Sequence, residues 1–236
     1  MKKKVLILGS SSGIGIDIIK IFLKNNFEII AHYNKGNQNF FNFLKKNDIN
    51  KIKFNFSTDL KKIENFSKNK LFSKCDVLIN AIGQIKEIDY EKISSSQILD
   101  SIKVNLIPGI IFTKNIGIQM NGRKWGRIVH LGSIGVKFGG GEKNFAYSLS
   151  KHALEFFPSK SKKWIKNNVL MNTVRVGLTD TKIHKKLPTK NLKERIKLIP
   201  MKRMAATKEI AKLIYFLGSD ENSFISNEVI TIAGGE

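Results

Sequence analysis

Three residues near the middle of the chain have side chains that could move a proton together. Tyr147 and Lys151 are four residues apart, and on a helix this spacing places both side chains on one face. An ammonium group beside a phenol favours the phenolate, so the tyrosine could act as an acid or a base near neutral pH. Ser133, fourteen residues before Tyr147, would then hold a substrate oxygen. In isolation, the same tyrosine and lysine could also lie on a solvated helix face.

A glycine-rich segment near the start could bind a phosphate. Residues 9–15 read Gly-Ser-Ser-Ser-Gly-Ile-Gly and stand between a short apolar run and a helical pattern. Glycines at these positions permit a sharp turn, a close approach of the backbone to a pyrophosphate, and tight packing of the helix on the sheet. A glycine-rich turn is often only a turn, so the segment alone leaves both interpretations open.

The spacing of apolar residues predicts the elements that must position these side chains. The predicted strands are residues 4–8, 27–31, 51–56, 77–80, 127–131, 169–174 and 228–232. The predicted helices are residues 14–24, 39–46, 60–68, 96–119, 145–166 and 207–217. Strands that alternate with helices imply right-handed crossovers, so we predict a doubly wound α/β fold, a parallel sheet of about seven strands with helices on both faces. No repeat or linker divides the chain, and residues 1–236 are predicted to form one domain.

The composition narrows the classes of protein to which the chain can belong. A total of 41 Lys and Arg against 19 Asp and Glu gives a net charge of +22. This charge could reflect nucleic-acid binding, attraction of anionic ligands, or an A- and T-rich genome. Because the charges are scattered and form no basic tail, nucleic acid is the least favoured partner. The single cysteine, Cys75, allows no intramolecular disulfide and suits the cytoplasm. No apolar run reaches the roughly 18 residues of a membrane-spanning helix.

Taken together, in this order and at this separation, the glycine-rich turn and the Tyr147–Lys151 pair resemble the short-chain dehydrogenase/reductase family, in its single-domain, Rossmann-type branch. The resemblance extends over residues 4–235. Further family marks are Asp59-Leu60, Asn80-Ala81-Ile82-Gly83, Asn105, Asn172, and the segments 200–203, 209–211, 216–220 and 233–235. The second strand and the C-terminal pattern are most similar to the 3-oxoacyl-[acyl-carrier-protein] reductases.

The resemblance implies an oxidoreductase that acts on CH-OH or C=O groups with a nicotinamide cofactor. Tyr147 would give a proton to the substrate oxygen, and Lys151 would lower the tyrosine pKa and bind the nicotinamide ribose. Ser133 would orient the carbonyl, and Asn105 would hold a water molecule in a proton relay. The residues implied to contact the cofactor are Gly9, Ser11, Ser12, Gly13, Ile14, Gly15, Asn34, Lys35, Asp59, Leu60, Asn80, Ala81, Tyr147, Lys151, Gly177, Thr179 and Thr181.

The end of the second strand bears on the choice between NADP(H) and NAD(H). An acidic residue there would bind the ribose 2′-hydroxyl, and a basic residue would bind the 2′-phosphate. The sequence His32-Tyr33-Asn34-Lys35 has no acid and resembles that of NADP-dependent members, with Asn34 and Lys35 placed for the phosphate. NAD(H) remains the alternative, because Lys35 could be a solvated loop lysine and Ser12 stands where NADP users often have a basic residue.

The sequence departs from the family pattern in three places. Val176 precedes Gly177 where the family usually has proline, and Ala81-Ile82 replaces Asn-Ala after the fourth strand. Pro158 falls inside the predicted helix 145–166, which in this family normally packs against a partner subunit, so we expect the helix to kink or end there. A homodimer or homotetramer is implied by the family, with an altered interface helix.

The sequence therefore predicts an NADPH-dependent carbonyl reductase whose substrate is an anionic small molecule or is bound to an acidic carrier. One candidate is a 3-oxoacyl thioester on acyl carrier protein, and another is a nucleotide-linked or cell-surface sugar. A third alternative is a basic binding or regulatory protein on the same fold. Residues 181–200 would form a lid with the basic side chains Lys182, His184, Lys185, Lys186, Lys190, Lys193, Arg195 and Lys197. The four histidines have no metal-binding spacing, so no metal site is predicted.

Overall fold

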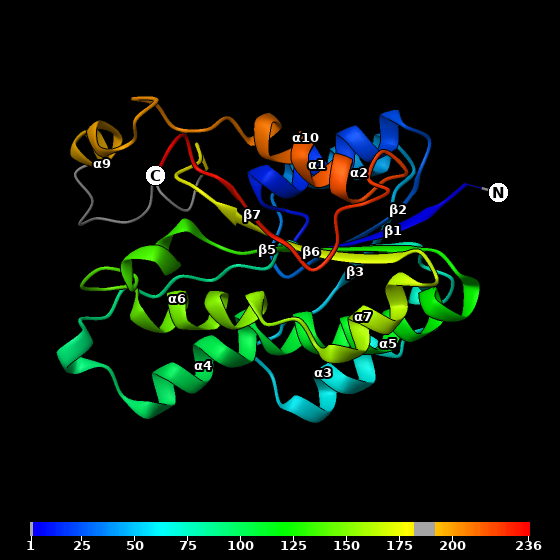
Figure 1. Ribbon diagram of the computed structural model, residues 1–236, viewed down its shortest axis with the longest axis horizontal. Helices are drawn as coiled ribbons and strands as arrows, with labels where there is room; N and C mark the ends of the chain where they lie inside the picture. The colour runs from blue at the N-terminus through cyan, green and yellow to red at the C-terminus, as the bar shows by residue number, and fades with distance from the viewer. Residues whose placement is uncertain (1, 182–191) are drawn as a thin grey trace.

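The computed structural model describes residues 2–181 and 192–236, in which a central parallel sheet lies between two layers of helices (Figure 1). The seven strands are ordered β3-β2-β1-β4-β5-β6-β7, and every neighbouring pair is parallel. The strands are β1 (Lys4–Leu8), β2 (Glu28–Tyr33), β3 (Asn50–Lys53), β4 (Val77–Asn80), β5 (Gly126–Leu131), β6 (Val169–Val176) and β7 (Val229–Ile232). The predicted doubly wound α/β fold is confirmed.

The strand order creates the crevice in which a site can form. After β1 the chain moves to β2 and β3 on one side, and it then returns to place β4 on the other side of β1. In sheets of this kind, the loops after the two central strands diverge and leave an opening at the carboxyl ends of the strands. The glycine-rich turn comes directly after β1, and residues 81–83 come directly after β4, so both segments border this opening.

The two helical layers can be seen in Figure 1. Helices α1 (Gly13–Lys24), α2 (Gln38–Lys46) and α10 (Thr207–Leu217) cover one face. The other face is covered by α3 (Leu60–Ser67), α4 (Ser95–Asn105), α5 (Ile107–Arg123), α6 (Phe145–His152) and α7 (Ser159–Ile165). A short helix, α9 (Leu192–Leu198), lies beyond one end of the sheet, on the same side as α10 in Figure 1. Within the described residues, no helix is long and apolar enough to cross a membrane.

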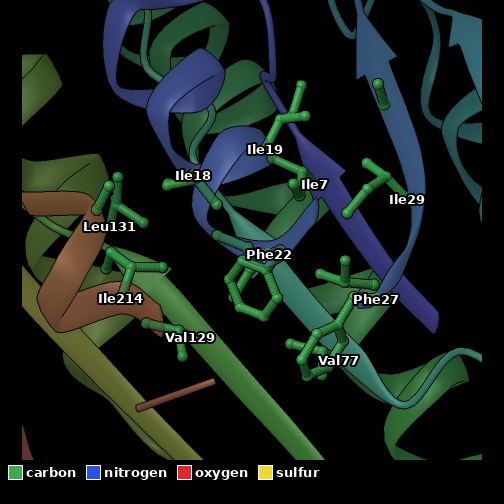
Figure 2. Close-up of a cluster of buried hydrophobic side chains, with 14 of the residues drawn as sticks. Ile7, Ile18, Ile19, Phe22, Phe27, Ile29, Val77, Val129, Leu131 and Ile214 are labelled. Carbon is green, nitrogen blue, oxygen red and sulfur yellow. The ribbon is translucent and has the colours of Figure 1, made fainter. Parts of the chain in front are cut away.

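Each face of the sheet has its own hydrophobic core. Figure 2 shows the first, in which Phe22 of α1 and Ile214 of α10 pack with strand residues such as Val129. The second core joins α3, α5 and α7 to the opposite face through Phe112 and Trp164 among others. Burial on both faces explains why the central strands read as continuous apolar runs rather than as alternating patterns.

Two predicted helices are divided in the structure, and each division lies near a proline. The predicted helix 96–119 is instead α4 and α5, which meet at Leu106, with Pro108 in the first turn of α5. Proline lacks the backbone N–H that a continuous helix would need there, but it fits a first helical turn. The predicted helix 145–166 ends as expected before Pro158, which caps α7. A short 3₁₀ helix, η4 (Ala153–Glu155), lies between α6 and Pro158.

The two segments predicted as loops, residues 134–144 and 181–200, each contain a short helix in the structure. Residues 134–144 form a short 3₁₀ helix, η3 (Ile134–Phe138), and then three glycines with positive φ. In the segment 181–200, residues 192–198 form α9 rather than a loop. The predicted lid residues 182–191, including five of its basic side chains, lie outside the described residues.

Candidate active site

A cavity of about 1310 Å³ lies at the carboxyl ends of the central strands. Its wall is formed by the turn after β1, the loops after β4 and β5, one face of α6, and the end of β6. This volume exceeds the roughly 300–1,000 Å³ of a typical small-ligand pocket. The cavity is therefore large enough for a dinucleotide and a second molecule beside it.

The glycine-rich turn forms one end of the cavity. Gly9 has φ of +79°, and a Cβ at this position would lie 2.7 Å from the backbone oxygen of Ala81. A Cβ on Gly15 would lie 2.6 Å from the oxygen of Ser10, so helix α1 can approach the turn only with glycine there. Ser12 caps α1 by accepting a hydrogen bond from the backbone N–H of Gly15 at 2.9 Å. The turn leaves the N-terminus of α1 open to the cavity, which suits an anionic group.

His32, at the end of β2, holds this turn in place. The backbone N–H of Gly9 donates to His32 Nδ1 at 3.2 Å, and the ring Nε2 bonds the oxygen of Phe54 at 3.1 Å. The backbone N–H of Ser10 donates to the His32 oxygen at 2.9 Å. Burial lowers the pKa of His32 to about 4, so its ring is neutral and Nδ1 can accept. Sequence reasoning missed this role, because it depends on the β1–β2 register.

Tyr147 and Lys151 project from α6 into the same part of the cavity. A Cβ placed on Gly83 would lie 3.8 Å from Tyr147 Oη and 3.9 Å from Lys151 Nζ, so both groups converge on this glycine. Lys151 is buried, and its Nζ donates to the backbone oxygens of Ile82 at 2.6 Å and Leu131 at 2.7 Å. Burial lowers the pKa of Lys151 to about 7. The predicted shared face of one helix is thus present.

The phenol of Tyr147 is held in its neutral form. Burial raises the pKa of Tyr147 to about 12, and a hydrogen bond with Ser133 only partly opposes this effect. Lys151 was expected to lower this pKa, but its ammonium group is directed at the carbonyls of Ile82 and Leu131. A neutral phenol at pH 7 is a proton donor, which fits an acid rather than a base.

Ser133 and Asn105 are the other two residues that were predicted to act with this pair. Ser133 comes after β5 and lines the cavity, and its Oγ accepts a hydrogen bond from the N–H of Gly135 at 3.1 Å. Asn105, at the end of α4, is buried and binds the backbone of Gln84 twice, at 2.8 Å through Oδ1 and at 3.1 Å through Nδ2. The Asn105 side chain therefore fixes the loop after β4, and its role in a proton relay stays a prediction.

The structure brings together part of the set predicted to contact the cofactor. The residues of that set that line the cavity are Ser11, Ser12, Gly13, Ile14, Ala81, Tyr147, Lys151, Gly177, Thr179 and Thr181. Asn34 and Lys35 are exposed after β2 and do not line it. Asp59 caps α3 by accepting from the N–H of Lys62 at 2.9 Å, and Leu60 is largely exposed beside it.

Asn80 has a different environment from the open one expected for a ribose contact. Its side chain is fully buried, with Nδ2 3.2 Å from His130 Nδ1 and Oδ1 3.4 Å from the N–H of Ile82. His130 in turn bonds Thr113 of α5 at 3.1 Å, and burial lowers the pKa of His130 to about 4. This neutral network lies beneath the segment whose Ile82 oxygen accepts from Lys151.

Several cavity residues were missed by sequence reasoning. Asn37 caps α2 by accepting from the N–H of Phe40 at 2.9 Å and also lines the cavity. Arg195 of α9, which was predicted as a basic residue of the lid, forms an ion pair with Glu236, and both residues line the cavity. Thr207, the first residue of α10, lines it beside the glycine-rich turn. No local sequence pattern marks Asn37, Thr207 or Glu236 as cavity residues, because they reach the cavity only through tertiary packing.

The geometry defines a nucleotide-binding α/β domain with a tyrosine–lysine pair, and comparison with known proteins names its family. The chain matches the adh_short_C2 family model, described as Enoyl-(Acyl carrier protein) reductase, over residues 9–236. The chain therefore belongs to this family of short-chain dehydrogenases/reductases and is an NAD(P)-dependent oxidoreductase. The resemblance inferred from its motifs is confirmed.

Curated relatives match over nearly the whole chain. A 3-oxoacyl-[acyl-carrier-protein] reductase, FabG, of Buchnera aphidicola subsp. Schizaphis graminum is 28% identical over 243 residues, which cover 99% of this chain and 97% of the relative. An acetoacetyl-CoA reductase of Shinella zoogloeoides is 29% identical over 240 residues, covering 100% and 99% of the two chains. Most of each relative's length is thus represented here.

Solved structures share the fold at lower identity. ElxO with NADP bound superposes with a TM-score of 0.86 at 24% identity, covering 100% of this chain and 98% of the other. A 3-oxoacyl-(acyl-carrier-protein) reductase of Agrobacterium tumefaciens C58, also with NADP bound, gives a TM-score of 0.88 at 22% identity, covering 99% and 94%. These similarities support the same arrangement of strands and helices.

Proposed function

We propose that this protein is an NADPH-dependent carbonyl reductase in which Tyr147 supplies the proton to the carbonyl oxygen. The observation that carries the proposal is the convergence of Tyr147 Oη and Lys151 Nζ on Gly83, in a cavity whose other end is the glycine-rich turn. One site can thus hold a dinucleotide and a carbonyl compound together. The names of the curated relatives, both ketone reductases, support the same reaction.

The residues of the cavity fit a nicotinamide dinucleotide. The backbone of residues 11–14 lines the cavity at the N-terminus of α1, where Gly13 has only two threonine methyl groups near the position of a Cβ. Thr179 and Thr181 would border the nicotinamide end, as the family resemblance implies. When bound, the reduced cofactor supplies a hydride to the substrate carbon. The remaining chemistry belongs to the protein side chains.

NADP(H) is proposed over NAD(H) because of the residues between β2 and α2. In the described residues no acidic side chain lies in this segment, where one would favour a free ribose 2′-hydroxyl. Asn34 and Lys35 are exposed there, and Asn37 reaches the cavity wall. These donors suit a 2′-phosphate, and the similar solved structures described with NADP bound support the choice.

The proton transfer depends on the ionisation of Tyr147. Because burial keeps the pKa of Tyr147 at about 12, the phenol carries its proton at neutral pH and can donate it to the substrate oxygen. Ser133, which forms a hydrogen bond with the Tyr147 phenol, would also bind the substrate oxygen and so orient the carbonyl. Lys151 Nζ lies 5.9 Å from the centre of the Tyr147 ring and would bind the nicotinamide ribose, as the family resemblance implies.

The proposed substrate is a 3-oxoacyl thioester carried by an anionic group, either acyl carrier protein or coenzyme A. The net charge of +22 would attract such a carrier, and Arg195, which is paired with Glu236, lines the cavity. The relatives are named for these two substrate types. A sugar ketone is the alternative that the activity test must exclude.

We also propose a homodimer or homotetramer. Large apolar side chains are exposed on neighbouring helices of one layer, with Leu99 on α4, Ile110 and Ile118 on α5, and Phe156 after η4. Burying them against a second copy would remove this apolar surface from water. The assembled mass in solution tests this part of the proposal.

The activity test uses the loss of NADPH absorbance with 3-oxoacyl thioesters and, separately, with keto-sugars. Tyr147→Phe is expected to lower kcat/KM by at least about a hundredfold, because it removes only the acid hydroxyl. Tyr90→Phe is the matched control, since Tyr90 is exposed and does not line the cavity. Absence of turnover with every substrate, together with no rise in melting temperature on adding NADPH, would refute the proposal.

A further inference from the structure

Asp17 is unusual for its place in α1. The helix begins at the glycine-rich turn, and its buried side is otherwise formed by glycine and apolar residues such as Ile18 and Phe22. Asp17 is nevertheless buried, about one turn beyond the N-terminus at which a phosphate would bind. A carboxylate so close to a phosphate site repels the ligand unless other groups hold and neutralise it.

The carboxylate is held by two side chains. Thr207 donates its hydroxyl proton to Asp17 Oδ2 at 2.6 Å, and Lys20 Nζ donates to Oδ1 at 2.9 Å. Burial by itself raises the pKa of Asp17, but these two hydrogen bonds and the nearby Lys208 outweigh it, so the pKa lies below its ordinary value. Asp17 is thus ionised, and its bond to Thr207 is charge-assisted.

Thr207 connects this bond to the cavity. Its methyl carbon Cγ2 lies 3.3 Å from the position that a Cβ on Gly13 would occupy, and the methyl of Thr181 lies 3.8 Å from the same point. Thr207 lines the cavity, as does Gly13. The first residue of α10 therefore forms the wall directly beside the backbone that would hold the pyrophosphate.

The same region of chain is joined to the end of β6. The backbone N–H of Asp180 donates to the oxygen of Ala205 at 3.0 Å, and the N–H of Ala205 donates to the oxygen of Leu178 at 2.9 Å. Farther along the two helices, Phe22 of α1 and Ile214 of α10 pack in the core (Figure 2). Nearer to the cavity than this core, the side chain of Asp17 in α1 accepts a hydrogen bond from Thr207 of α10.

We propose that Asp17 and Thr207 are cofactor-positioning residues, whose hydrogen bond fixes the start of α10 against the glycine-rich turn and so sets the shape of the pyrophosphate end of the cavity. The inference rests on the proposed function in that the ligand is NADP(H). It assigns a role outside the glycine-rich motif to a residue pair 190 positions apart in the sequence. A bond that only stabilised the fold would leave cofactor affinity unchanged.

Thr207→Val tests the hydroxyl, because valine keeps the methyl beside Gly13 and cannot donate to Asp17. The dissociation constant of NADPH, measured by fluorescence without substrate, is expected to rise about tenfold, as for loss of a hydrogen bond to a charged group. With saturating NADPH, kcat is expected to stay within about twofold, because the groups at the carbonyl are untouched. Thr207→Ser keeps the hydroxyl and is expected to restore most of the affinity.

The control is a hydrogen bond of the same length between two helices on the opposite face of the sheet. Asn115 Nδ2 of α5 donates to Ser67 Oγ of α3 at 2.6 Å, away from the residues that line the cavity. Ser67→Ala is expected to lower the melting temperature and to leave the NADPH dissociation constant unchanged. This variant separates a general loss of stability from a loss of cofactor positioning.

A double-variant comparison tests whether Asp17 acts through Thr207. In an Asp17→Ala background, Thr207→Val is expected to change NADPH affinity by less than about twofold, because the bond is already gone. The inference is overturned if Thr207→Val lowers the melting temperature but not NADPH affinity, or if Thr207→Ser weakens binding as much as Thr207→Val. If the wild-type protein binds no NADPH at all, the proposed function fails instead.

Discussion

The two ends of the cavity differ in how completely their polar groups are bonded. At the glycine-rich end, His32 holds the turn, Ser12 caps α1, and Asp17 is bound by Thr207 and Lys20. At the end near α6, the buried atoms Asn144 Oδ1, Ser148 Oγ and Glu236 Oε2 have no hydrogen-bond partner within the described residues, and all three residues line the cavity. Such atoms are rare in folded proteins. The fold alone thus supplies hydrogen-bond partners for these groups at the glycine-rich end, which we call the cofactor end. At the end near α6, which we call the substrate end, three buried polar atoms have no partner within the described residues.

The largest effect is expected at the catalytic end. Lys151→Met removes the ammonium that lies beside Tyr147 and leaves the oxygens of Ile82 and Leu131 without their donor. We expect kcat to fall by about a thousandfold, within the range for loss of a group that assists proton transfer. NADPH-dependent turnover with a 3-oxoacyl thioester is the measurement. Lys160→Met, an exposed change of the same charge on α7, should stay near the wild-type rate, and a similar loss there would contradict the assignment.

Gly9→Ala tests how rigid the cofactor end is. The new Cβ would lie 2.7 Å from the oxygen of Ala81 at a φ of +79°, so either the turn or the loop after β4 must move. We expect the free energy of unfolding to fall by about 2 kcal/mol and NADPH binding to weaken at least about tenfold. Gly122→Ala is the matched control, because a Cβ there meets nothing within 4 Å. In helix α5 this change should raise stability by about 0.5–1 kcal/mol.

Two neutral histidines give the two ends a common pH dependence. Burial lowers the pKa of His32 and of His130 from 6.5 to about 4, so the unfolded chain binds protons first as the pH falls. Their contribution to stability is therefore complete above about pH 6.5 and is lost toward pH 4, at about 1.4 kcal/mol per pH unit for each. Urea denaturation between pH 7 and pH 5 measures the slope.

Variants separate the two histidine contributions. His32→Gln and His130→Gln should each remove about half of the slope, because each deletes one titrating ring. His152→Gln, an exposed change on α6, is the control and should keep the wild-type slope. A full slope in His32→Gln would show that the glycine-rich turn is not held by a neutral imidazole.

Local sequence patterns were enough to predict most of the fold and the centre of the site. The remaining features depend on tertiary contacts. The strands, the glycine-rich turn and the Tyr147–Lys151 spacing depend on residues within one or two helical turns, so they could be predicted. The division between α4 and α5 was also signalled by Pro108, which the apolar periodicity of 96–119 masked. By contrast, the roles of His32 and Thr207 depend on partners in distant parts of the chain. The predicted cofactor contacts of Asp59 and Asn80 remain predictions, because their side chains serve a helix cap and a buried network.

The smallest effect tests the difference between the ends most directly, by comparing two buried serines. Ser148 lies at the α6 end of the cavity with an unpartnered Oγ, whereas the one hydroxyl proton of Ser161 in α7 has two acceptors within reach, the oxygen of Pro158 at 2.8 Å and Asn227 Oδ1 at 3.0 Å. Ser161→Ala removes the hydroxyl and leaves its acceptor without a hydrogen-bond partner. This change should destabilise the protein by about 1 kcal/mol. Deleting an unbonded hydroxyl removes a desolvation cost, so Ser148→Ala should leave stability unchanged or raise it by up to about 1 kcal/mol. Urea denaturation of both variants without ligand measures the two changes. Equal destabilisation by both would mean that the Ser148 hydroxyl is satisfied in the folded protein, and the two ends of the cavity would then not differ in this way.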